Sequence, residues 1–175
     1  LKNLYTFNLL YLKKMIKSDL FITELVEKFN SIFLTNKIEF KIFDEFTSRD
    51  YFKKNIDSSL NKTKGVYLFQ TKKDGIIYIG SSGKVIDAET KSNQGIRSRI
   101  LNGSSPYKLE GEFLKYKESK SNKYSEKYHY RLKDLEIYYY EIGEGIFTIP
   151  SVLEHLIIQV FYNKTGRIPI INRKL

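Results

Sequence analysis

The stretch GVYLFQTKKDGIIYIGSS, residues 65–82, contains two β-rich runs that flank a turn. The runs are residues 65–69 and 76–82, and the dipeptide Asp74-Gly75 lies between them. Asp-Gly between such runs is a strong signal for a β-hairpin, because glycine adopts the positive φ angles that tight turns require. We therefore predict an antiparallel pair of strands in this stretch.

Each predicted strand carries a tyrosine near a glycine. Tyr67 follows Gly65 by two residues, and Tyr78 precedes Gly80 by two residues. Glycine within a strand is unusual and often marks a place where another group approaches the backbone closely. Two tyrosines on neighbouring strands also occur as ordinary cross-strand packing, so the pair has both a structural and a functional interpretation.

Downstream of the hairpin, the sequence predicts a helix, a strand and a second helix. Residues 83–95 are polar and are expected to form a loop, and residues 96–102 have apolar side chains on one side of a helix. Residues 135–142 (LEIYYYEI) are typical of a strand. Residues 151–162 form a strongly apolar helix, with Ser151 as its expected N-cap.

Upstream of the hairpin, residues 1–60 are expected to form a mainly helical N-terminal extension. Residues 8–34 have apolar side chains at helical spacing, and residues 38–46 form a strand or a short irregular segment. Residues 47–64 are polar and are expected to connect the extension to the main domain, residues 61–175. The expected fold class is α+β, with a small antiparallel three-stranded sheet flanked by helices.

Length and composition limit the sites that the chain supports. Its 175 residues suit one compact domain with an appendage, and 41% hydrophobic residues suffice for a core. Cysteine is absent and His129 and His155 are the only histidines, so cysteine sites and multi-histidine sites are excluded. Any metal must rely on carboxylates and water, which favours a hard ion such as Mg²⁺ or Mn²⁺.

No apolar run of the sequence is long enough to span a membrane. The apolar start, residues 1–17, is followed by an amphipathic segment and lacks a small-residue cleavage site. We therefore expect this start to be part of the fold of a cytoplasmic protein.

The net charge of +10 is concentrated in the middle of the chain. Residues 61–136 contain 16 lysines and arginines against 9 aspartates and glutamates, whereas residues 1–60 contain 10 against 8. A localised basic excess is the pattern that phosphate contacts require, since bound cations release counterions from nucleic acid. A solubilising surface has the same composition, so charge alone does not separate the two interpretations.

Glu154 lies in the predicted late helix with Ile157, Ile158 and Phe161 as helical neighbours. A carboxylate on an apolar helix face is costly to bury without a partner, so it needs a cation. An arginine in a structural salt bridge and a metal ion both meet this need.

Two arginines, Arg97 and Arg99, open the helix that follows the hairpin. Arginine is suited to bidentate phosphate binding and to stabilising the charge of a phosphoryl transition state. A solvated helix face would also carry such residues.

Two tripeptides, GVY (65–67) and YIG (78–80), are followed along the chain by an arginine, a glutamate and an asparagine. In this order the five elements resemble the signature of the GIY-YIG nuclease superfamily. The resemblance extends from residue 65 to the C-terminal segment, which makes it more specific than the two triplets alone. It implies that residues 61–175 are the catalytic domain of a magnesium-dependent endonuclease that hydrolyses phosphodiester bonds in double-stranded DNA. The matching elements are GVY (65–67), YIG (78–80), Arg99, Glu154 and Asn172.

The resemblance implies a role for each matching residue. Glu154 would hold Mg²⁺, or Mn²⁺ in its place, through one carboxylate oxygen. Tyr67 or Tyr78 would be the general base, and we favour Tyr67 with Tyr78 hydrogen-bonded nearby. Arg99 would clamp the phosphate. Asn172 would position Glu154 or the DNA backbone.

The sequence departs from the usual family pattern in three places. Val66 replaces isoleucine in the first triplet, and Gly103 lies one helical turn after Arg99, where members often carry His, Tyr or Lys. Arg97 is the alternative phosphate clamp. The loop 83–95 is longer than in the simplest members. This longer loop, together with the helical N-terminal extension, resembles the restriction-endonuclease branch of the family. Candidates for the role missing at Gly103 are Tyr107, Lys84 and Ser82.

Substrate and partners follow from the same resemblance. A type II restriction enzyme acting on a palindromic site calls for a homodimer. A cognate DNA methyltransferase would be its system partner, and no membrane partner is expected. The alternatives are a homing or repair nuclease and a catalytically inactive DNA-binding module. The predicted DNA-contacting residues are Arg97, Lys84, Lys108 and Tyr107, which lie in or near the loop 83–95 and the basic segment 104–134.

Overall fold

The computed structural model describes residues 40–44, 46–82, 95–102, 106–117, 124–142 and 150–172, together with Thr23, Glu24 and Glu27. The chain divides into two compact units, Leu1–Ile38 and Glu39–Leu175. The boundary expected at residue 60 therefore falls inside the second unit. The helix expected over residues 8–34 lies outside the described residues, apart from Thr23, Glu24 and Glu27, which are helical.

The second unit contains two antiparallel sheets and three helices among its described residues. The α+β class with antiparallel sheets is thereby confirmed. In the described part of the chain, no helix has the length and apolar character needed to cross a bilayer. In chain order the elements are β1 (Lys41–Phe43), α3 (Arg49–Asn55), the 3₁₀ turn η1 (Ser58–Asn61), β2 (Gly65–Thr71), β3 (Gly75–Ser82), α4 (Ile96–Asn102), β4 (Tyr107–Glu110), β5 (Phe113–Lys117), β6 (Tyr124–Arg131), the 3₁₀ turn η2 (Leu132–Asp134), β7 (Leu135–Glu141) and α5 (Pro150–Thr165).

The three predicted strands are neighbours in a sheet of four, with the order β1-β7-β2-β3. The register pairs Tyr67 with Gly80 and Phe69 with Tyr78 across β2 and β3. The fourth strand, β1, pairs with β7 and comes from the segment for which the sequence left a strand and an irregular conformation open. The sheet is therefore one strand larger than expected.

The hairpin turns at the predicted dipeptide. Gly75 has a φ angle of 69°, in the left-handed region that costs glycine little. The N–H of Asp74 donates to the Thr71 hydroxyl at 3.0 Å, which satisfies one backbone donor inside the turn. Local sequence chemistry thus explains the position of this turn.

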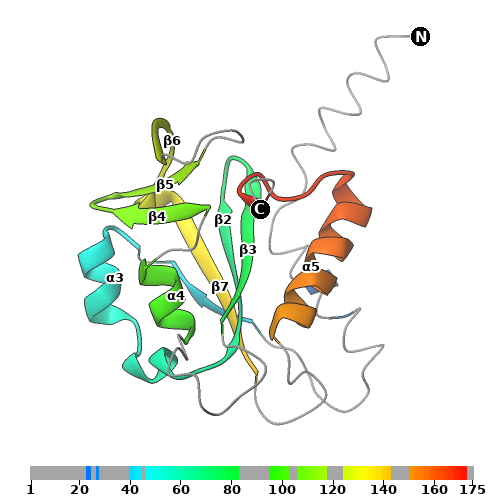
Figure 1. Ribbon diagram of the computed structural model, residues 1–175, viewed down its shortest axis with the longest axis horizontal. Coiled ribbons are helices and arrows are strands. Elements are labelled where there is room, and N and C mark those ends of the chain that lie inside the picture. Colours follow the sequence, from blue (N-terminus) through cyan, green and yellow to red (C-terminus); the bar gives the residue numbers. More distant parts are fainter. Residues whose placement is uncertain are drawn as a thin grey trace. The chain divides into compact units, whose positions relative to one another are not determined.

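Helices cover both faces of the four-stranded sheet (Figure 1). α5 packs against β3 and β2 and buries Leu153, Ile157 and Phe161. α4 packs against the same two strands from the other face and buries Ile96 and Ile100. All residues of β2 are consequently buried, which is why this strand lacks a polar face.

Two helix predictions are wrong. The segment expected as a connection contains α3, which begins after the cap Ser48, whose side chain accepts from the N–H of Tyr51 at 3.1 Å. This helix buries only Phe52, so it lacks the repeated apolar spacing that identifies longer helices. Ser151 is not the N-cap of α5, because the helix already includes Pro150, whose missing N–H suits the first turn.

The sequence does not predict the second sheet, which has the order β4-β5-β6. It lies at one end of the four-stranded sheet, and β4 packs beside α4 (Figure 1). Its buried side chains are Tyr107, Leu109, Leu114 and Tyr116 on one face and Lys115 on the other, and the alternate positions are polar apart from Phe113. Tyrosines that alternate with lysines have the composition of a polar loop, which hides the strand pattern.

Candidate active site

Tyr67 on β2 and Tyr78 on β3 lie on the same face of the sheet, with ring centroids 5.9 Å apart. Their side chains are 1% and 4% exposed. A Cβ on Gly80, which lies opposite Tyr67, would be 2.7 Å from Cε1 of Tyr78 and 3.0 Å from Cζ of Tyr67. Gly80 therefore provides the space that the two rings occupy, which gives the glycine of the second triplet a physical reason.

A chain of hydroxyl groups links the tyrosines to α4. The hydroxyl oxygens of Tyr67 and Tyr107 lie 3.3 Å apart, and the Tyr107 hydroxyl donates to the backbone oxygen of Arg99 at 3.2 Å. Because Tyr107 uses its proton for Arg99, Tyr67 is the donor to Tyr107. Burial raises the pKa of Tyr67 well above its ordinary value of 10, and Tyr107 and Tyr78 raise this pKa further. Tyr67 is therefore a neutral donor in this structure.

Glu154 approaches from the other face of the sheet, on the first turns of α5. Its Oε2 accepts a hydrogen bond from the hydroxyl of Ser81 on β3. Burial raises the pKa of Glu154 above its ordinary 4.5, whereas the Ser81 hydrogen bond and the charges of His155 and Arg99 lower this pKa. The carboxylate has no ion pair within the described ranges, so a bound cation would stabilise it.

Arg99 and Glu154 flank the same strand. β3 is the outermost strand of its sheet, and both α4, which carries Arg99, and α5, which carries Glu154, pack against it. The charge of Arg99 lowers the pKa of both Glu154 and Tyr107. Since the guanidinium makes no hydrogen bond or ion pair with any other described residue, it is available to a phosphate.

Asn172 covers part of the β3 edge. Its Oδ1 accepts from the N–H of Ile79 at 2.8 Å, and its Nδ2 donates to the carbonyl of Ile79 at 2.7 Å. The N–H of Ile171 donates to the carbonyl of Ile77 at 2.9 Å, so the C-terminal segment pairs like a short strand. Both ends of the Asn172 amide are thus engaged by the strand that carries Gly80 and Ser81. Its contacts are with β3 and not with Glu154.

Arg97 and Lys84 do not join this group of residues. Arg97 donates to Oδ1 of Asn61 at 3.1 Å and to the carbonyl of Lys53 at 2.6 Å, which ties α4 to η1 and α3. Its guanidinium thus has protein partners where that of Arg99 has none among the described residues. Lys84 lies outside the described residues.

The other three candidates lie in different surroundings. The buried hydroxyl of Ser82 donates to the carbonyl of Thr63 at 3.3 Å, away from Glu154. Tyr107 is fully buried, so it contributes the link between Tyr67 and α4 and does not present a ring to DNA. Lys108 forms an ion pair with Glu110 on the same strand.

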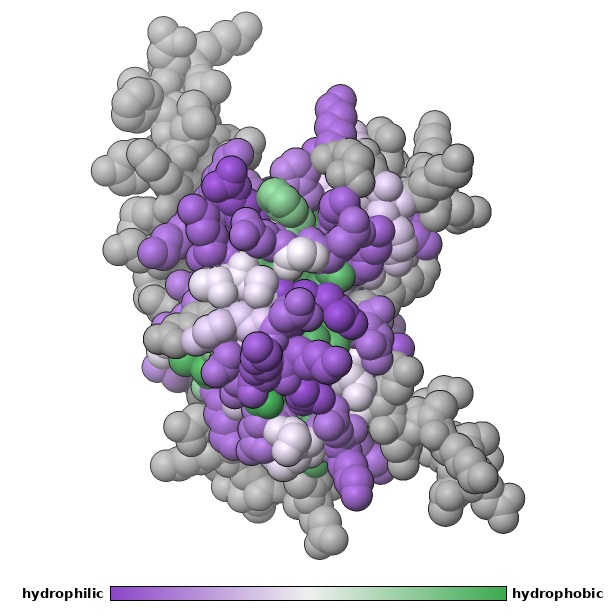
Figure 2. Space-filling model, turned by 90° about the vertical axis from the view of Figure 1, so that its left-hand side faces the viewer, coloured by the Kyte–Doolittle hydropathy of each residue, from purple (hydrophilic) through white to green (hydrophobic). Residues whose placement is uncertain are grey.

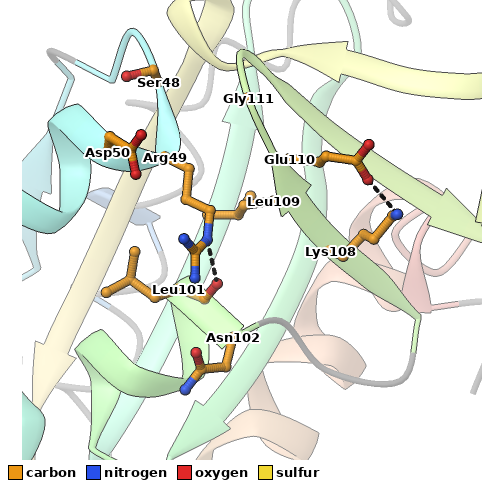
Figure 3. A pocket seen from close by; sticks show the side chains of 9 residues that line it. All are labelled: Ser48, Arg49, Asp50, Leu101, Asn102, Lys108, Leu109, Glu110 and Gly111. Carbon is orange, nitrogen blue, oxygen red and sulfur yellow. Dashed lines mark hydrogen bonds and ion pairs between the residues drawn. The ribbon is translucent and has the colours of Figure 1, made fainter.

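A pocket of about 480 Å³ lies beside this centre, between α3, the end of α4 and β4 (Figure 3). Arg49 donates to the carbonyl of Leu101 across it at 3.5 Å, and the ion pair of Lys108 and Glu110 lies along its wall (Figure 3). The side of the molecule that carries α3 and α4 is mostly hydrophilic, with apolar residues in small separate groups (Figure 2). Neither the paired tyrosines nor Glu154 line the pocket, so it is separate from the candidate site.

The donor set at Glu154 fits a sparsely coordinated Mg²⁺. No cluster of three or more His, Cys, Asp or Glu side chains occurs in the described residues, so Glu154 would supply the only protein carboxylate known there. Its Oε1 accepts no hydrogen bond from this part of the chain, whereas Oε2 is used by Ser81. Mg²⁺ often keeps several waters and takes one or two carboxylates plus substrate phosphate oxygens, which matches this arrangement.

The sequence interpretation misses Ser81. The position of Ser81 directly after the YIG triplet could have identified it. Strand alternation places residue 81 on the opposite face of the sheet from Tyr78 and Gly80. Glu154 was expected on the helix that covers that face, so a hydroxyl at this position was its natural partner.

No protein-family model, no curated protein and no solved structure matches this chain. The function must therefore be inferred from the residues and contacts of the chain itself.

Proposed function

We propose that this protein is a divalent-metal-dependent endonuclease that hydrolyses phosphodiester bonds in double-stranded DNA, with a reaction centre of GIY-YIG type. The observation that supports the proposal is the hydrogen bond of Glu154 to Ser81 on β3, together with Arg99 on α4, which packs against the same strand and whose charge lowers the pKa of Glu154. A carboxylate oxygen and a guanidinium that lack partners among the described residues are the groups that a metal ion and a phosphate need.

Each side chain has a distinct task in this proposal. Glu154 holds Mg²⁺ or Mn²⁺, and such an ion supplies polarisation of the scissile phosphate and stabilisation of the leaving oxygen. Ser81 orients the Glu154 carboxylate through its hydrogen bond. Arg99 binds phosphate oxygens and stabilises the charge that develops on them. Asn172 holds the backbone of β3 and, through it, the position of Ser81.

Tyr67 accepts the proton of the attacking water, with Tyr78 packed against its ring. This role needs the phenolate, which the raised pKa of Tyr67 makes rare at neutral pH. We therefore expect kcat to rise about tenfold per pH unit while most of Tyr67 stays protonated. Tyr67→Phe should abolish this slope and Tyr78→Phe should retain it. The reverse result would assign the base to Tyr78.

We further propose a restriction role in the cytoplasm, in which a homodimer cuts a palindromic site and a cognate methyltransferase protects host DNA. The basic excess of residues 61–136 suits contacts to a duplex. Two centres related by symmetry would give double-strand breaks with a fixed stagger. Nicking alone at saturating DNA would indicate a monomer and favour a homing or repair role.

The test is cleavage of supercoiled plasmid and phage DNA by the full chain with Mg²⁺, beside a reaction with EDTA. Glu154→Gln keeps the size of the side chain and removes its charge. The matched control is Glu112→Gln, at an exposed glutamate in the turn between β4 and β5. We expect discrete metal-dependent fragments from the wild type and the control, and a loss of about 10²- to 10³-fold in Glu154→Gln.

Unchanged cleavage by Glu154→Gln would remove Glu154 from the centre. No cleavage of several DNAs with several divalent metals, while DNA binding persists, would instead favour the inactive DNA-binding module.

A further inference from the structure

The three-stranded sheet has two chemically different faces, because side chains alternate along its strands. One face, the inner face, packs against the rest of the unit through Tyr107, Leu109, Leu114 and Tyr116. These side chains are at most 7% exposed. The residues between them must therefore point away from the core.

Cross-strand pairing collects these alternate residues into rows on the opposite face, which we call the outer face. Residues that pair directly across strands share a face, so each row is a set of neighbours. The first row is Lys108, Lys115 and His129, and the second row is Glu110, Phe113 and Arg131.

Lys117 and Tyr124 belong to the same surface. The ammonium groups of Lys108 and Lys117 lie over the Tyr124 ring, 5.3 Å and 5.1 Å from its centroid. The outer face thus brings together lysines that a single strand would separate. It also gives them an aromatic ring whose face attracts cations.

Among the described residues, the outer face carries five cations, Lys108, Lys115, Lys117, Lys127 and Arg131, against one carboxylate, Glu110. The Lys115 side chain is only 11% exposed, so the other four cations are the accessible ones. Glu110 forms ion pairs with both Lys108 and Lys115, the latter at 3.1 Å. The hydrogen bonds from the two lysines lower the pKa of Glu110 below its ordinary 4.5. Glu110 therefore stays ionised at neutral pH and occupies the position that an external anion would take between the two ammonium groups.

We propose that the outer face binds the sugar–phosphate backbone of duplex DNA away from the scissile bond, as an anchor that does not depend on base sequence. The inference rests on the proposed function and adds the surface that holds its substrate. Glu110 acts within it as an internal counter-ion that lowers the affinity for phosphate.

Three properties of the outer face fit duplex DNA. Cations on alternate residues of a strand lie about 7 Å apart and neighbouring strands about 5 Å apart, so the charges of the outer face form one compact cluster. Such a cluster gains affinity from phosphates by counterion release. Lys108 and Glu110 also line the pocket whose other wall includes Asn102, at the end of the helix that carries Arg99 (Figure 3).

The experiment measures equilibrium binding of the full chain to a fluorescent duplex of random sequence, in EDTA, over a series of salt concentrations. The double variant Lys117→Gln/Arg131→Gln removes two outer-face charges, and Glu110→Gln removes the internal counter-ion. The matched control is Lys72→Gln/Lys73→Gln, at two exposed lysines in the turn between β2 and β3. A parallel series with Mg²⁺ and saturating DNA measures kcat.

The outer-face double variant should bind more weakly at every salt concentration, with the slope of log K against log salt reduced by about 2. Glu110→Gln should shift affinity in the opposite direction and bind the duplex more tightly. The control should keep the wild-type slope. All three should retain the wild-type kcat, because none of these residues touches the reacting phosphate.

A double variant that matches the control, or a Glu110→Gln variant that fails to bind more tightly, would overturn the inference. So would wild-type binding to phosphatidylserine vesicles that is as tight as binding to the duplex and is weakened in the double variant. If the chain cleaves DNA but the outer-face variants do not change its affinity for the duplex, the anchor is rejected and the proposed function stays intact. Altered binding in a chain that never cleaves DNA would reject the proposed function and keep the anchor.

Discussion

The two sheets of this protein differ in how much of their surface is buried. The four-stranded sheet is covered on both faces, by α4 and α5, and every residue of β2 is buried. The three-stranded sheet buries one face, and the other face carries a cluster of lysines and arginine around Glu110. Residues of the candidate active site therefore lie where little change is tolerated, whereas the proposed DNA anchor lies where side chains can change without repacking a core.

The largest expected effect comes from a glycine of the four-stranded sheet. A Cβ on Gly65 would lie 2.0 Å from the backbone oxygen of Tyr140. Since a neighbouring strand cannot move aside easily, Gly65→Ala should lower the free energy of unfolding by about 3 kcal/mol, measured by urea denaturation. Gly111→Asn, in the open β4–β5 turn at a φ of 55°, should cost less than about 1 kcal/mol. An equal loss of unfolding free energy in Gly65→Ala and Gly111→Asn would show that the two sheets do not differ in their tolerance of substitution.

A smaller effect is expected at the edge of β3. Asn172→Ala leaves the N–H and carbonyl of Ile79 without their partners, which should cost about 2 kcal/mol of unfolding free energy. Cleavage should fall as well, because Ser81 follows Ile79 on the same strand. The control is Asn163→Ala on the exposed side of α5, where we expect a change below about 0.5 kcal/mol. Wild-type stability of Asn172→Ala would contradict the backbone role.

The hydroxyl chain between the sheets offers a third test. Tyr107→Phe removes the acceptor for Tyr67 and should cost about 1 kcal/mol of unfolding free energy. That hydrogen bond helps to raise the pKa of Tyr67, so its loss should shift the pH profile of kcat towards lower pH. Tyr162→Phe, at a half-exposed tyrosine of α5, is the control and should change neither quantity. A profile that stays in place would separate Tyr107 from the reaction centre.

The smallest effects concern two glutamates whose pKa values shift in opposite directions. The pKa of Glu154 is raised by burial, so its ionised form is disfavoured by folding. Glu154→Gln should therefore be slightly more stable than the wild type at neutral pH. This gain should vanish as the pH falls through the raised pKa towards the ordinary 4.5 and below, where both forms are neutral.

Glu110 should behave in the opposite way, because its lysine partners lower its pKa. Its ionised form is favoured by folding, so Glu110→Gln should lose a little stability at neutral pH. The loss should shrink as the pH falls from 4.5 through the lowered pKa. Thermal unfolding of Glu154→Gln and Glu110→Gln across this pH range measures whether each variant is more or less stable than the wild type. A change of stability in the same direction for both variants would contradict the opposite pKa shifts of the two glutamates.

Sequence patterns predicted the elements whose signals are local. The Asp74-Gly75 turn, β2, β3 and β7 occur where expected, and α4 (Ile96–Asn102) begins at the predicted residue. The signals failed for α3, which buries a single phenylalanine, and for β4 to β6, whose core is largely tyrosine. A tyrosine suits a buried inner face and a polar loop equally well, so composition does not separate them.

The sequence by itself determined the hairpin, the glycine that gives the two tyrosines their space (Gly80), and the residue types of the candidate site. Only the tertiary structure decided which of these residues meet. It joined Tyr67 to Tyr107, 40 residues away, and Asn172 to Ile79, 93 residues away. It also gave the guanidinium of Arg97 partners in Asn61 and Lys53. Turn and strand signals arise from backbone preferences of adjacent residues, whereas these contacts depend on which helix packs on which face of the sheet.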